Sequence, residues 1–473
     1  MLFSTIVFLG GFLPIVLLIY YVGLSGRRLL QNYFLLFASL AFYAWGEPLF
    51  VFVLILSFTG NWAFGLMLDR YIENRKAAKR IACGMLMFNL SILFIFKYTM
   101  FSISNINHLF GSDFTIPRII LPIGISFFTF QAISYVIDIY RGKKAVQRNL
   151  FNVGLYIAFF PQLIAGPIIR YETIADQIMH REESFDLFSQ GVCRFIAGLS
   201  KKVLLANSLA VVANKSFAVA QNGETSVSFL WLGAIAYTFQ IYFDFSGYSD
   251  MAIGLGKMFG FRFPENFNYP YISKSATEFW RRWHISLGSW FRDYVYIPLG
   301  GSRVSSKARL VGNLFIVWLL TGIWHGADWT FICWGLLYFV FITIEKLARF
   351  EERAIPGALK HVYILLIVII GWVLFRADTM ADAFEYLRIM FGFSGKPWID
   401  ANMIVFVKEY FFYFLFGLVF STPIARIMSA KLGNIDKKLA FSSLYVLVFT
   451  VVFLISVSYL VKGTYNPFIY FNF

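Results

Sequence analysis

The sequence predicts an all-α polytopic membrane protein in which residues 1–473 form a single transmembrane domain. Hydrophobic residues make up 59% of the chain and charged residues 14%, and with a mean hydropathy of +0.67 no soluble class fits. Apolar runs long enough to cross a bilayer core of about 30 Å recur along the whole chain. The loops between the first runs alternate in Lys and Arg content, and no internal repeat or linker divides the chain.

The net charge of +15 would suggest nucleic-acid binding in a soluble protein. In a membrane protein, basic cytoplasmic loops account for such a charge, so we expect the lipid bilayer as a partner and no nucleic acid. The three cysteines lie in apolar contexts without metal-like spacing. This excludes a disulfide framework, and no metal site is expected.

Four spans are expected near the N-terminus, at residues 2–22, 33–45, 49–68 and 81–101. Arg27 and Arg28 follow the first span and a basic loop at 70–80 follows the third, whereas Glu47 and Pro48 separate the second from the third. By the positive-inside rule, the N-terminus then lies outside the cytoplasm.

The chain becomes less regular after this point. The apolar run 119–140 precedes a basic loop at 141–148 and keeps the alternation. The run 151–163 leads into two prolines and a glycine at 161–167, which favours a half-span or re-entrant segment. Residues 170–190 are polar and charged and are expected to form a surface loop.

Residues 195–213 carry Lys201 and Lys202 within apolar sequence, which indicates a helix at the cytoplasmic interface with snorkelling lysines. A span is expected at 229–245, followed by an irregular aromatic loop at 259–271.

Residues 277–296 are predicted to form one amphipathic helix, which a Pro-Leu-Gly-Gly-Ser stretch at 298–302 ends. Its aromatic residues fall near one side and its charged residues elsewhere. Because it is too charged to span, we expect it to lie in the interface or inside the protein.

The apolar run 310–344 contains 35 residues, or about 52 Å as one straight helix. This is too long for one span and too short for two. We expect a break at Gly322 and Gly326, because glycine tolerates irregular backbone. Irregular backbone at membrane depth must be covered by protein or line a cavity, so His325 should face an internal cavity. Further spans are expected at 362–375, 405–420 and 441–460, before a tail at 462–473.

His325 is the first candidate for chemistry, because ionisable groups inside a membrane are costly and mark sites or pathways. Burial favours the neutral imidazole, which can accept a proton from a hydroxyl group. The alternative is a structural histidine bonded to a backbone carbonyl. His284 is a candidate to orient His325 or to hold an acceptor, and interfacial packing is its alternative.

Acidic residues near the histidines are candidates to tune them or to line a polar tunnel: Asp244, Asp250, Glu278, Asp293 and Asp328. Alternatively, each pairs with Arg281, Arg282 or Arg292. The sequence has no Gly-x-Ser-x-Gly nucleophile elbow and no phosphate-cradling glycine motif. Direct transfer or a relay is therefore expected, without a serine acyl intermediate.

Several motifs around the histidines carry a family resemblance. Residues 280–287 read Trp-Arg-Arg-Trp-His-Ile-Ser-Leu, and residues 321–326 read Thr-Gly-Ile-Trp-His-Gly. Together with 160–168 and 242–250, they resemble the membrane-bound O-acyltransferase (MBOAT) family. The closest resemblance is to the bacterial branch containing the alginate O-acetyltransferase membrane subunit and the teichoic-acid D-alanylation protein. The run 292–301 favours the acetyltransferases.

The resemblance implies about 10–12 transmembrane helices, with re-entrant and interfacial helices around a central tunnel. It implies that His325 is the catalytic histidine and His284 the second family histidine. The residues expected along the substrate tunnel are Trp283, Trp324, Asp328, Arg281, Arg282, Asp244 and Asp250.

The resemblance also implies a reaction. Acetyl-CoA or an acyl-carrier thioester would donate from the cytoplasm, with no bound cofactor, and the acyl group would leave on the outer face of the bacterial cytoplasmic (inner) membrane. An extracytoplasmic SGNH-type acetyltransferase would complete delivery to a polysaccharide acceptor such as alginate. Tyr470, in an aromatic C-terminal motif, would be the hydroxyl that His325 deprotonates. The alternative for Tyr470 is an aromatic interface anchor.

Other functions stay open from the residues alone. A transporter or flippase would use the intramembrane histidines as a proton relay, although the missing internal repeat counts against it. D-alanyl transfer and an inert scaffold for an outer transferase are further alternatives.

Overall fold

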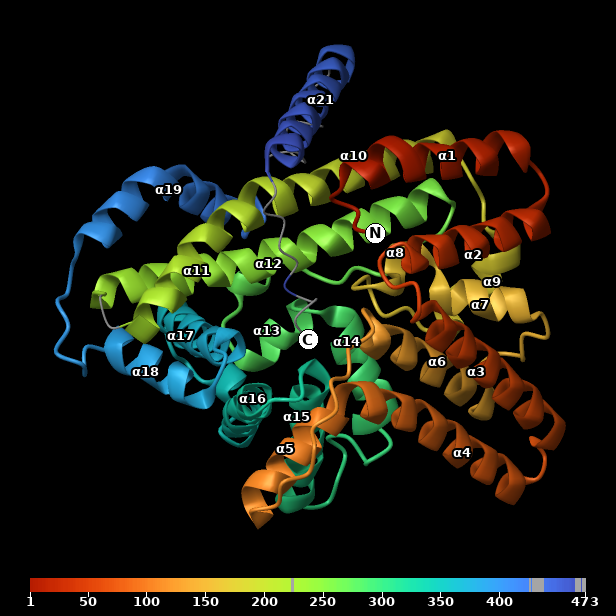
Figure 1. The fold of residues 1–473 in the computed structure, drawn as a ribbon, viewed down its shortest axis with the longest axis horizontal. Helices are drawn as coiled ribbons and strands as arrows, with labels where there is room; N and C mark the ends of the chain where they lie inside the picture. Colours follow the sequence, from red (N-terminus) through yellow and green to blue (C-terminus); the bar gives the residue numbers. More distant parts are fainter. Residues whose placement is uncertain (223–224, 425–426, 428–437, 464–468, 470–473) are drawn as a thin grey trace. The chain divides into compact units, whose positions relative to one another are not determined.

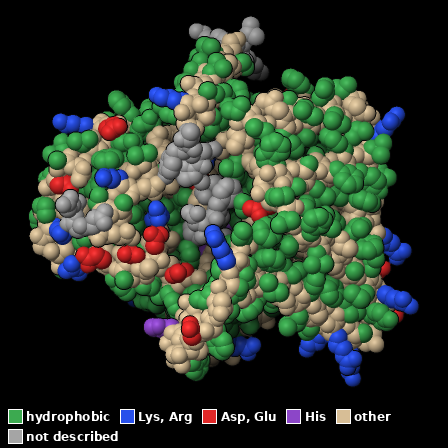
Figure 2. Space-filling model, viewed as in Figure 1, with side chains coloured by type: hydrophobic (Ala, Val, Ile, Leu, Met, Phe, Trp, Pro, Cys, Tyr) green, Lys and Arg blue, Asp and Glu red, His purple; other side chains and the backbone are tan. Residues whose placement is uncertain are grey.

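The computed structural model describes residues 1–222, 225–424, 427, 438–463 and 469, and all regular structure among them is helical (Figure 1). Hydrophobic side chains cover most of the face shown in Figure 2. Eight described helical stretches are long and apolar enough to cross a membrane: Val51–Tyr71, Arg75–Phe110, Phe185–Gln221, Lys307–His325, Trp329–Leu347, Gly357–Arg376, Ala401–Phe420 and Ser443–Lys462. Phe8–Gly23 and Ile125–Tyr140 are shorter apolar helices. The all-α membrane fold class is confirmed.

The chain divides into two compact units. Unit 1 comprises Met1–Phe195 and Ser249–Pro264, and unit 2 comprises Ile196–Tyr248 and Glu265–Phe473. Helices α10 (Phe185–Ser200) and α12 (Val227–Met258) contribute residues to both units. Labels with η mark π- or 3₁₀-helices. The other helices of unit 1 are η1 Phe8–Phe12, α1 Leu13–Leu18, η2 Ile19–Gly23, α2 Arg28–Ala44, α3 Val51–Tyr71, α4 Arg75–Leu93, η3 Phe94–Tyr98, α5 Thr99–Phe110, α6 Ile125–Tyr140, α7 Leu150–Ala158, α8 Phe160–Leu163 and α9 Tyr171–His180.

Buried polar contacts tie unit 1 together. The amides of Asn61 on α3 and Asn89 on α4 donate to each other at 3.0 and 2.9 Å, as polar side chains do between membrane helices. Arg28 on α2 pairs with Glu183 and donates to the carbonyl of Arg181 at 2.7 Å. These bonds fix the segment that precedes α10.

Unit 2 holds both candidate histidines. Its remaining described helices are η4 Lys201–Ala206, α11 Asn207–Asn222, η5 Pro270–Ile272, α13 Ala276–Arg282, α14 Ile285–Phe291, η6 Arg292–Tyr296, α15 Lys307–His325, α16 Trp329–Leu347, η7 Phe350–Glu352, α17 Gly357–Arg376, α18 Met380–Met390, α19 Ala401–Phe420 and α21 Lys438–Lys462.

Helices α15 and α16 form a hairpin in which the two backbones touch. A Cβ atom on Gly322 would lie 2.6 Å from the carbonyl oxygen of Phe331, and one on Gly335 would lie 2.5 Å from that of Trp318. Glycine is therefore required where the helices meet. The break predicted near Gly326 is confirmed. The expectation that the run is too short for two spans is wrong, because basic residues extend α15 to a length of 19 residues and α16 also has 19.

Other predicted boundaries are also wrong. Residues 170–190 contain α9 and the start of α10, where a surface loop was expected. Residues 195–213 lie within a continuous 37-residue stretch, Phe185–Gln221, and Lys202 is buried inside unit 2 where we expected a snorkelling side chain. The predicted helix 277–296 is divided at His284.

Candidate active site

His284 lies between two short helices, where the chain changes direction. Its φ of 44° is left-handed, an uncommon conformation for a residue with a side chain. The backbone N–H of Ile285 donates to the carbonyl of Asn266 at 2.9 Å, and that of Asn268 donates to the carbonyl of Arg282 at 2.9 Å. The aromatic loop before α13 therefore holds the turn in place.

The side chain of Asn266 orients the His284 ring. Its Oδ1 accepts from the backbone N–H and the hydroxyl of Ser286, at 3.2 and 2.9 Å, and lies 3.2 Å from Nδ1 of His284. Because Oδ1 acts as an acceptor, the ring proton lies on Nδ1 and Nε2 is the basic nitrogen. Burial lowers the pKa of His284 to about 3, so the ring is neutral at ordinary pH. Sequence reasoning missed Asn266, which lies in a loop without periodicity.

His325 is the last residue of α15 and is buried among aromatic rings. Its ring centroid lies 4.8 Å from those of Trp324 and Trp334 and 5.2 Å from that of Phe375. The Trp324 ring also lies 6.1 Å from that of His284. The structure thus brings the rings of both predicted histidines near one indole, from segments about 40 residues apart in the sequence.

A cavity of about 290 Å³ lies close to this aromatic cluster. Residues that line it include Trp280, Arg281, Arg292, Trp318, Thr321 and Lys346. The Trp334 ring contacts both Trp280, at 5.5 Å, and His325. Thr321 lies one helical turn before His325 on α15. One layer of side chains therefore separates the cavity from the candidate base.

Glu345 is a second residue that the sequence did not reveal. This buried side chain of α16 accepts from the backbone N–H groups of Ala276 and Thr277, at 2.6 and 2.9 Å, and from the Thr277 hydroxyl at 2.9 Å. A carboxylate at a helix N-terminus satisfies free N–H groups and is favoured by the helix dipole. Glu345 thereby fixes the start of α13, the helix that leads into His284.

Asp244 makes contacts that differ from those expected. Its Oδ1 lies 2.5 Å from Nζ of Lys202, where pairing with an arginine was the alternative considered. Its Oδ2 accepts the backbone N–H of Ile469 at 2.8 Å, and all three residues are buried. Asp244 therefore holds one point of the C-terminal tail inside unit 2. Tyr470 lies outside the described residues.

Three further predicted residues make contacts that serve the fold. Asp250 pairs with Arg194 at 2.6 Å within unit 1. The Asp328 side chain caps α16 by accepting the backbone N–H of Thr330 at 3.0 Å. Trp283 is buried against Trp372, with ring centroids 4.8 Å apart.

Of the five acidic residues, Glu278 and Asp293 form the arginine pairs that were considered as the alternative. Arg282 donates to Glu278 at 2.9 Å, and Arg292 donates to Asp293 at 2.7 Å. Arg281 lies 3.7 Å from Glu351 and lines the cavity described above.

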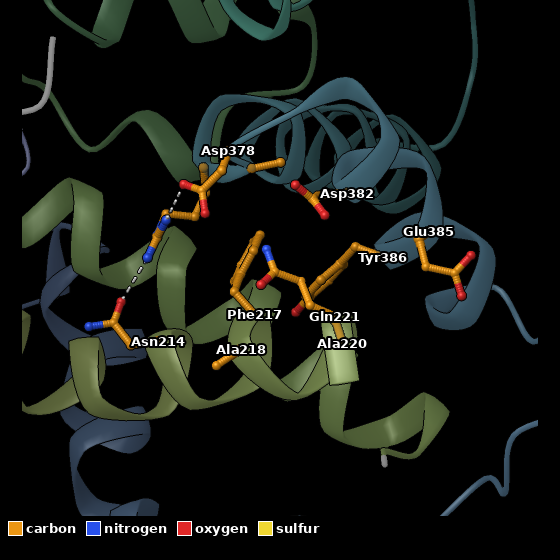
Figure 3. Close-up of a pocket in the computed structure, with 11 residues that line it drawn as sticks. Asn214, Phe217, Ala218, Ala220, Gln221, Asp378, Asp382, Glu385 and Tyr386 are labelled. Carbon is orange, nitrogen blue, oxygen red and sulfur yellow. Dashed lines mark hydrogen bonds and ion pairs between the residues drawn. The ribbon is translucent and has the colours of Figure 1, made fainter. Parts of the chain in front are cut away.

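Another cavity of unit 2, about 150 Å³, lies among α11, α18 and the end of α17 (Figure 3). Phe217 stacks on Tyr386 at 4.3 Å, and the Arg376 guanidinium lies 5.3 Å from the Phe217 ring and 3.7 Å from Asp378. None of the predicted site residues is among those that line it. The histidine cluster therefore remains the candidate active site.

Comparison with known proteins identifies the family of the chain. The model of the MBOAT, membrane-bound O-acyltransferase family, matches residues 143–376, which include both histidines. The probable alginate O-acetylase AlgI of Pseudomonas aeruginosa is 46% identical over 407 residues, covering 85% of this chain and 77% of the relative. The protein of the same name from Pseudomonas putida is 41% identical over 497 aligned residues and covers 100% of both chains.

A more distant relative has a different named substrate. The peptidoglycan O-acetyltransferase of Helicobacter pylori is 34% identical over 430 residues, covering 84% of this chain and 80% of the relative. The identity and coverage of these relatives show that the chain is an O-acyltransferase and belongs to the membrane-bound O-acyltransferase family.

Proposed function

We propose that this membrane O-acyltransferase takes an acetyl group from a cytoplasmic thioester and passes it across the membrane for O-acetylation of an extracytoplasmic polysaccharide. The observation that carries the proposal is that the His284 and His325 rings both lie near the Trp324 ring, with centroids 6.1 and 4.8 Å from it. Two histidines that lie near one buried indole can supply a base and a second polar ring, in surroundings that hold little water.

His325 is the proposed general base. It takes the proton of an acceptor hydroxyl while the hydroxyl oxygen attacks the thioester carbonyl carbon. The new C–O bond forms, the C–S bond breaks, and the proton passes from His325 to the departing thiolate. The aromatic rings around His325 exclude water, which would otherwise compete as acceptor.

The cavity beside Trp280 is the proposed entrance for the thioester. Its indole walls suit an apolar pantetheine arm, and Arg281, Arg292 and Lys346 supply positive charge for phosphate groups. Acetyl-CoA and an acyl-carrier protein both present a phosphopantetheine thioester, so this chemistry fits either donor. No bound cofactor is required.

Tyr470 is the proposed acceptor of the acyl group within the chain, and the acyl ester is then passed outward. Support comes from Ile469, the residue before it, whose backbone is fixed to the buried Asp244. Two tunnel residues that the family resemblance implied, Trp283 and Asp328, serve packing and capping in the structure and have no role in this proposal.

The acceptor is proposed to be a bacterial polysaccharide outside the cytoplasmic membrane. The relatives are named for O-acetylation of alginate and of peptidoglycan, which are both glycans. An SGNH-type transferase on the outer side would complete delivery. The alternation of basic loops supports an N-terminus outside the cytoplasm.

Incubation of the purified full-length chain with radiolabelled acetyl-CoA tests the proposal. We expect label on the protein, reduced about 10²–10⁴-fold in His325→Ala because a general base is lost. His361→Ala is the matched control, since the His361 ring contacts the carbonyl of Ser273 at 2.9 Å and lies 14 residues, or about 21 Å along α17, before Phe375 of the aromatic cluster. Unchanged labelling in His325→Ala, or solute uptake without any labelling, would contradict the proposal and favour a scaffold or a transporter.

A further inference from the structure

Two spans of unit 2 are far less covered by protein than the others. In α19 and α21, 6% of the apolar window is buried, whereas the other six spans have 28–56% buried. One end of α21 projects beyond the other helices of its unit in Figure 1, whereas Ser456 and Tyr459 near its other end contact Ser200 and Tyr413. Lipid is a sufficient neighbour for the apolar side chains on these helices.

Between these helices lies a polar groove, which we define as the cavity of about 330 Å³ formed by η4, α11, α19 and α21. Its polar lining residues are Asn207, Ser208, Glu409, Tyr410, Tyr413 and Tyr459. The hydroxyl groups of Tyr413 and Tyr459 lie 3.2 Å apart and join α19 to α21. Hydroxyl and carboxyl groups inside a bilayer require polar neighbours, which lipid tails do not supply.

Of the polar groups that line the groove, the carboxyl group of Glu409 is the one that lipid tails stabilise least. It lies on α19, which runs from Ala401 to Phe420, and is therefore about 12 Å from the start of the helix at about 1.5 Å per residue. Its side chain is exposed, and it forms no ion pair with Lys or Arg in the part of the chain that the structure describes. An ionisable group at membrane depth normally faces a partner of opposite charge.

We propose that the polar groove binds a transmembrane helix of another protein chain, which carries one Lys or Arg at the depth of Glu409. The cation would pair with the Glu409 carboxylate, and the tyrosine hydroxyls can bond to polar groups beside it. A helix presents such a side chain from an apolar surface that also covers the exposed faces of α19 and α21.

The groove also lies next to the tail anchor. Lys202, which pairs with Asp244, and Val203, which lines the groove, are consecutive residues of η4. A helix bound in the groove would therefore contact the same helical segment that holds the C-terminal tail through Asp244. This places the partner where the tail leaves α21, but the docking itself does not depend on the acyltransfer chemistry proposed above.

The test uses the full-length protein in lipid vesicles and synthetic transmembrane peptides. One Leu–Ala peptide carries a single Lys about eight residues from its end, and its match carries Met at that position. Energy transfer between labelled peptide and labelled protein measures binding. We expect the Lys peptide to bind about tenfold more tightly than the Met peptide.

The preference for the Lys peptide should disappear in Glu409→Gln. It should persist in Lys408→Met, because Lys408 is the neighbouring charge and does not line the groove. Size-exclusion chromatography of each variant checks that it remains folded. Equal binding of the two peptides to the unaltered protein would overturn the proposal, as would a Lys preference that survives in Glu409→Gln. Energy transfer between copies of this chain that requires Glu409 would overturn it in favour of self-association.

Discussion

The carboxylate of Asp244 and the ammonium group of Lys202 form a buried ion pair with 2.5 Å between Oδ1 and Nζ. The second carboxylate oxygen accepts the backbone N–H of Ile469. One acidic side chain therefore neutralises a buried cation and fixes a residue of the C-terminal tail.

Asp244→Asn should strongly destabilise the protein, because it removes the charge that compensates Lys202. Breaking a buried pair on one side costs about 3–5 kcal/mol, whereas the double change Asp244→Asn with Lys202→Met should cost less than the two single changes summed. Thermal unfolding in detergent measures this.

Asp378→Asn is the matched control, because that aspartate is exposed and lies 3.7 Å from its partner Arg376. Surface pairs contribute about 0–1 kcal/mol. If Asp244→Asn unfolds at the same temperature as this control, the buried pair does not stabilise the fold.

Asn266→Ala should lower the turnover of acetyl transfer about 10–100-fold, as expected for a residue that acts by orienting another. The loss arises because Oδ1 of Asn266 holds the proton of His284 on Nδ1. Since Asn266 does not line the cavity beside Trp280, the KM for acetyl-CoA should stay within about twofold. Steady-state kinetics distinguishes the two constants.

Asn266→Asp keeps an acceptor oxygen toward Nδ1 and serves as the conservative variant. It should recover turnover relative to Asn266→Ala. A rise in KM without a fall in turnover would assign Asn266 to substrate binding and contradict the orienting role.

The all-α membrane class could be predicted from the sequence, as could the two histidines whose rings lie near Trp324. Long apolar runs and the Gly322/Gly326 pair consist of residues close together in the sequence, so hydropathy and glycine positions reveal the helices and the break between them. The division at His284 could not be predicted, because no glycine or proline marks it and its left-handed backbone depends on bonds to Asn266.

The partners of the buried charges could not be predicted either. Lys202 and Asp244 are about 40 residues apart in the sequence, and their contact depends on how η4 and α12 pack. Glu345 reaches α13 from α16 in the same way. Sequence patterns report the period of one helix, whereas these contacts join residues of different helices.

Acidification should destabilise the protein through His284. Burial lowers its pKa from 6.5 to about 3, so the unfolded chain binds a proton in this range before the folded protein does. The stability is fully present above pH 6.5 and is lost progressively as the pH falls toward 3. Thermal unfolding between pH 7 and pH 4 should show a smaller loss in His284→Asn than in the unaltered protein. An equal loss would show that other groups cause the acid sensitivity.

Arg281→Gln should raise the KM for acetyl-CoA about fivefold to twentyfold, while turnover changes by less than about twofold. The reason is that a charge that holds the donor stabilises the bound substrate and the transition state equally. Arg281 lines the cavity beside Trp280, and its side chain is 67% exposed, so a phosphate group can reach it. The effect should shrink as salt concentration rises, since exposed charges are screened.

Arg282→Gln is the sharpest control for this prediction, because it removes the same charge from the neighbouring position. Arg282 points to Glu278 and to the carbonyl of Asn268, at 2.9 and 3.1 Å, and does not line the cavity. Its KM should therefore match that of the unaltered protein. If both variants raise KM equally, net charge alone attracts the donor, and the cavity beside Trp280 is not its binding site.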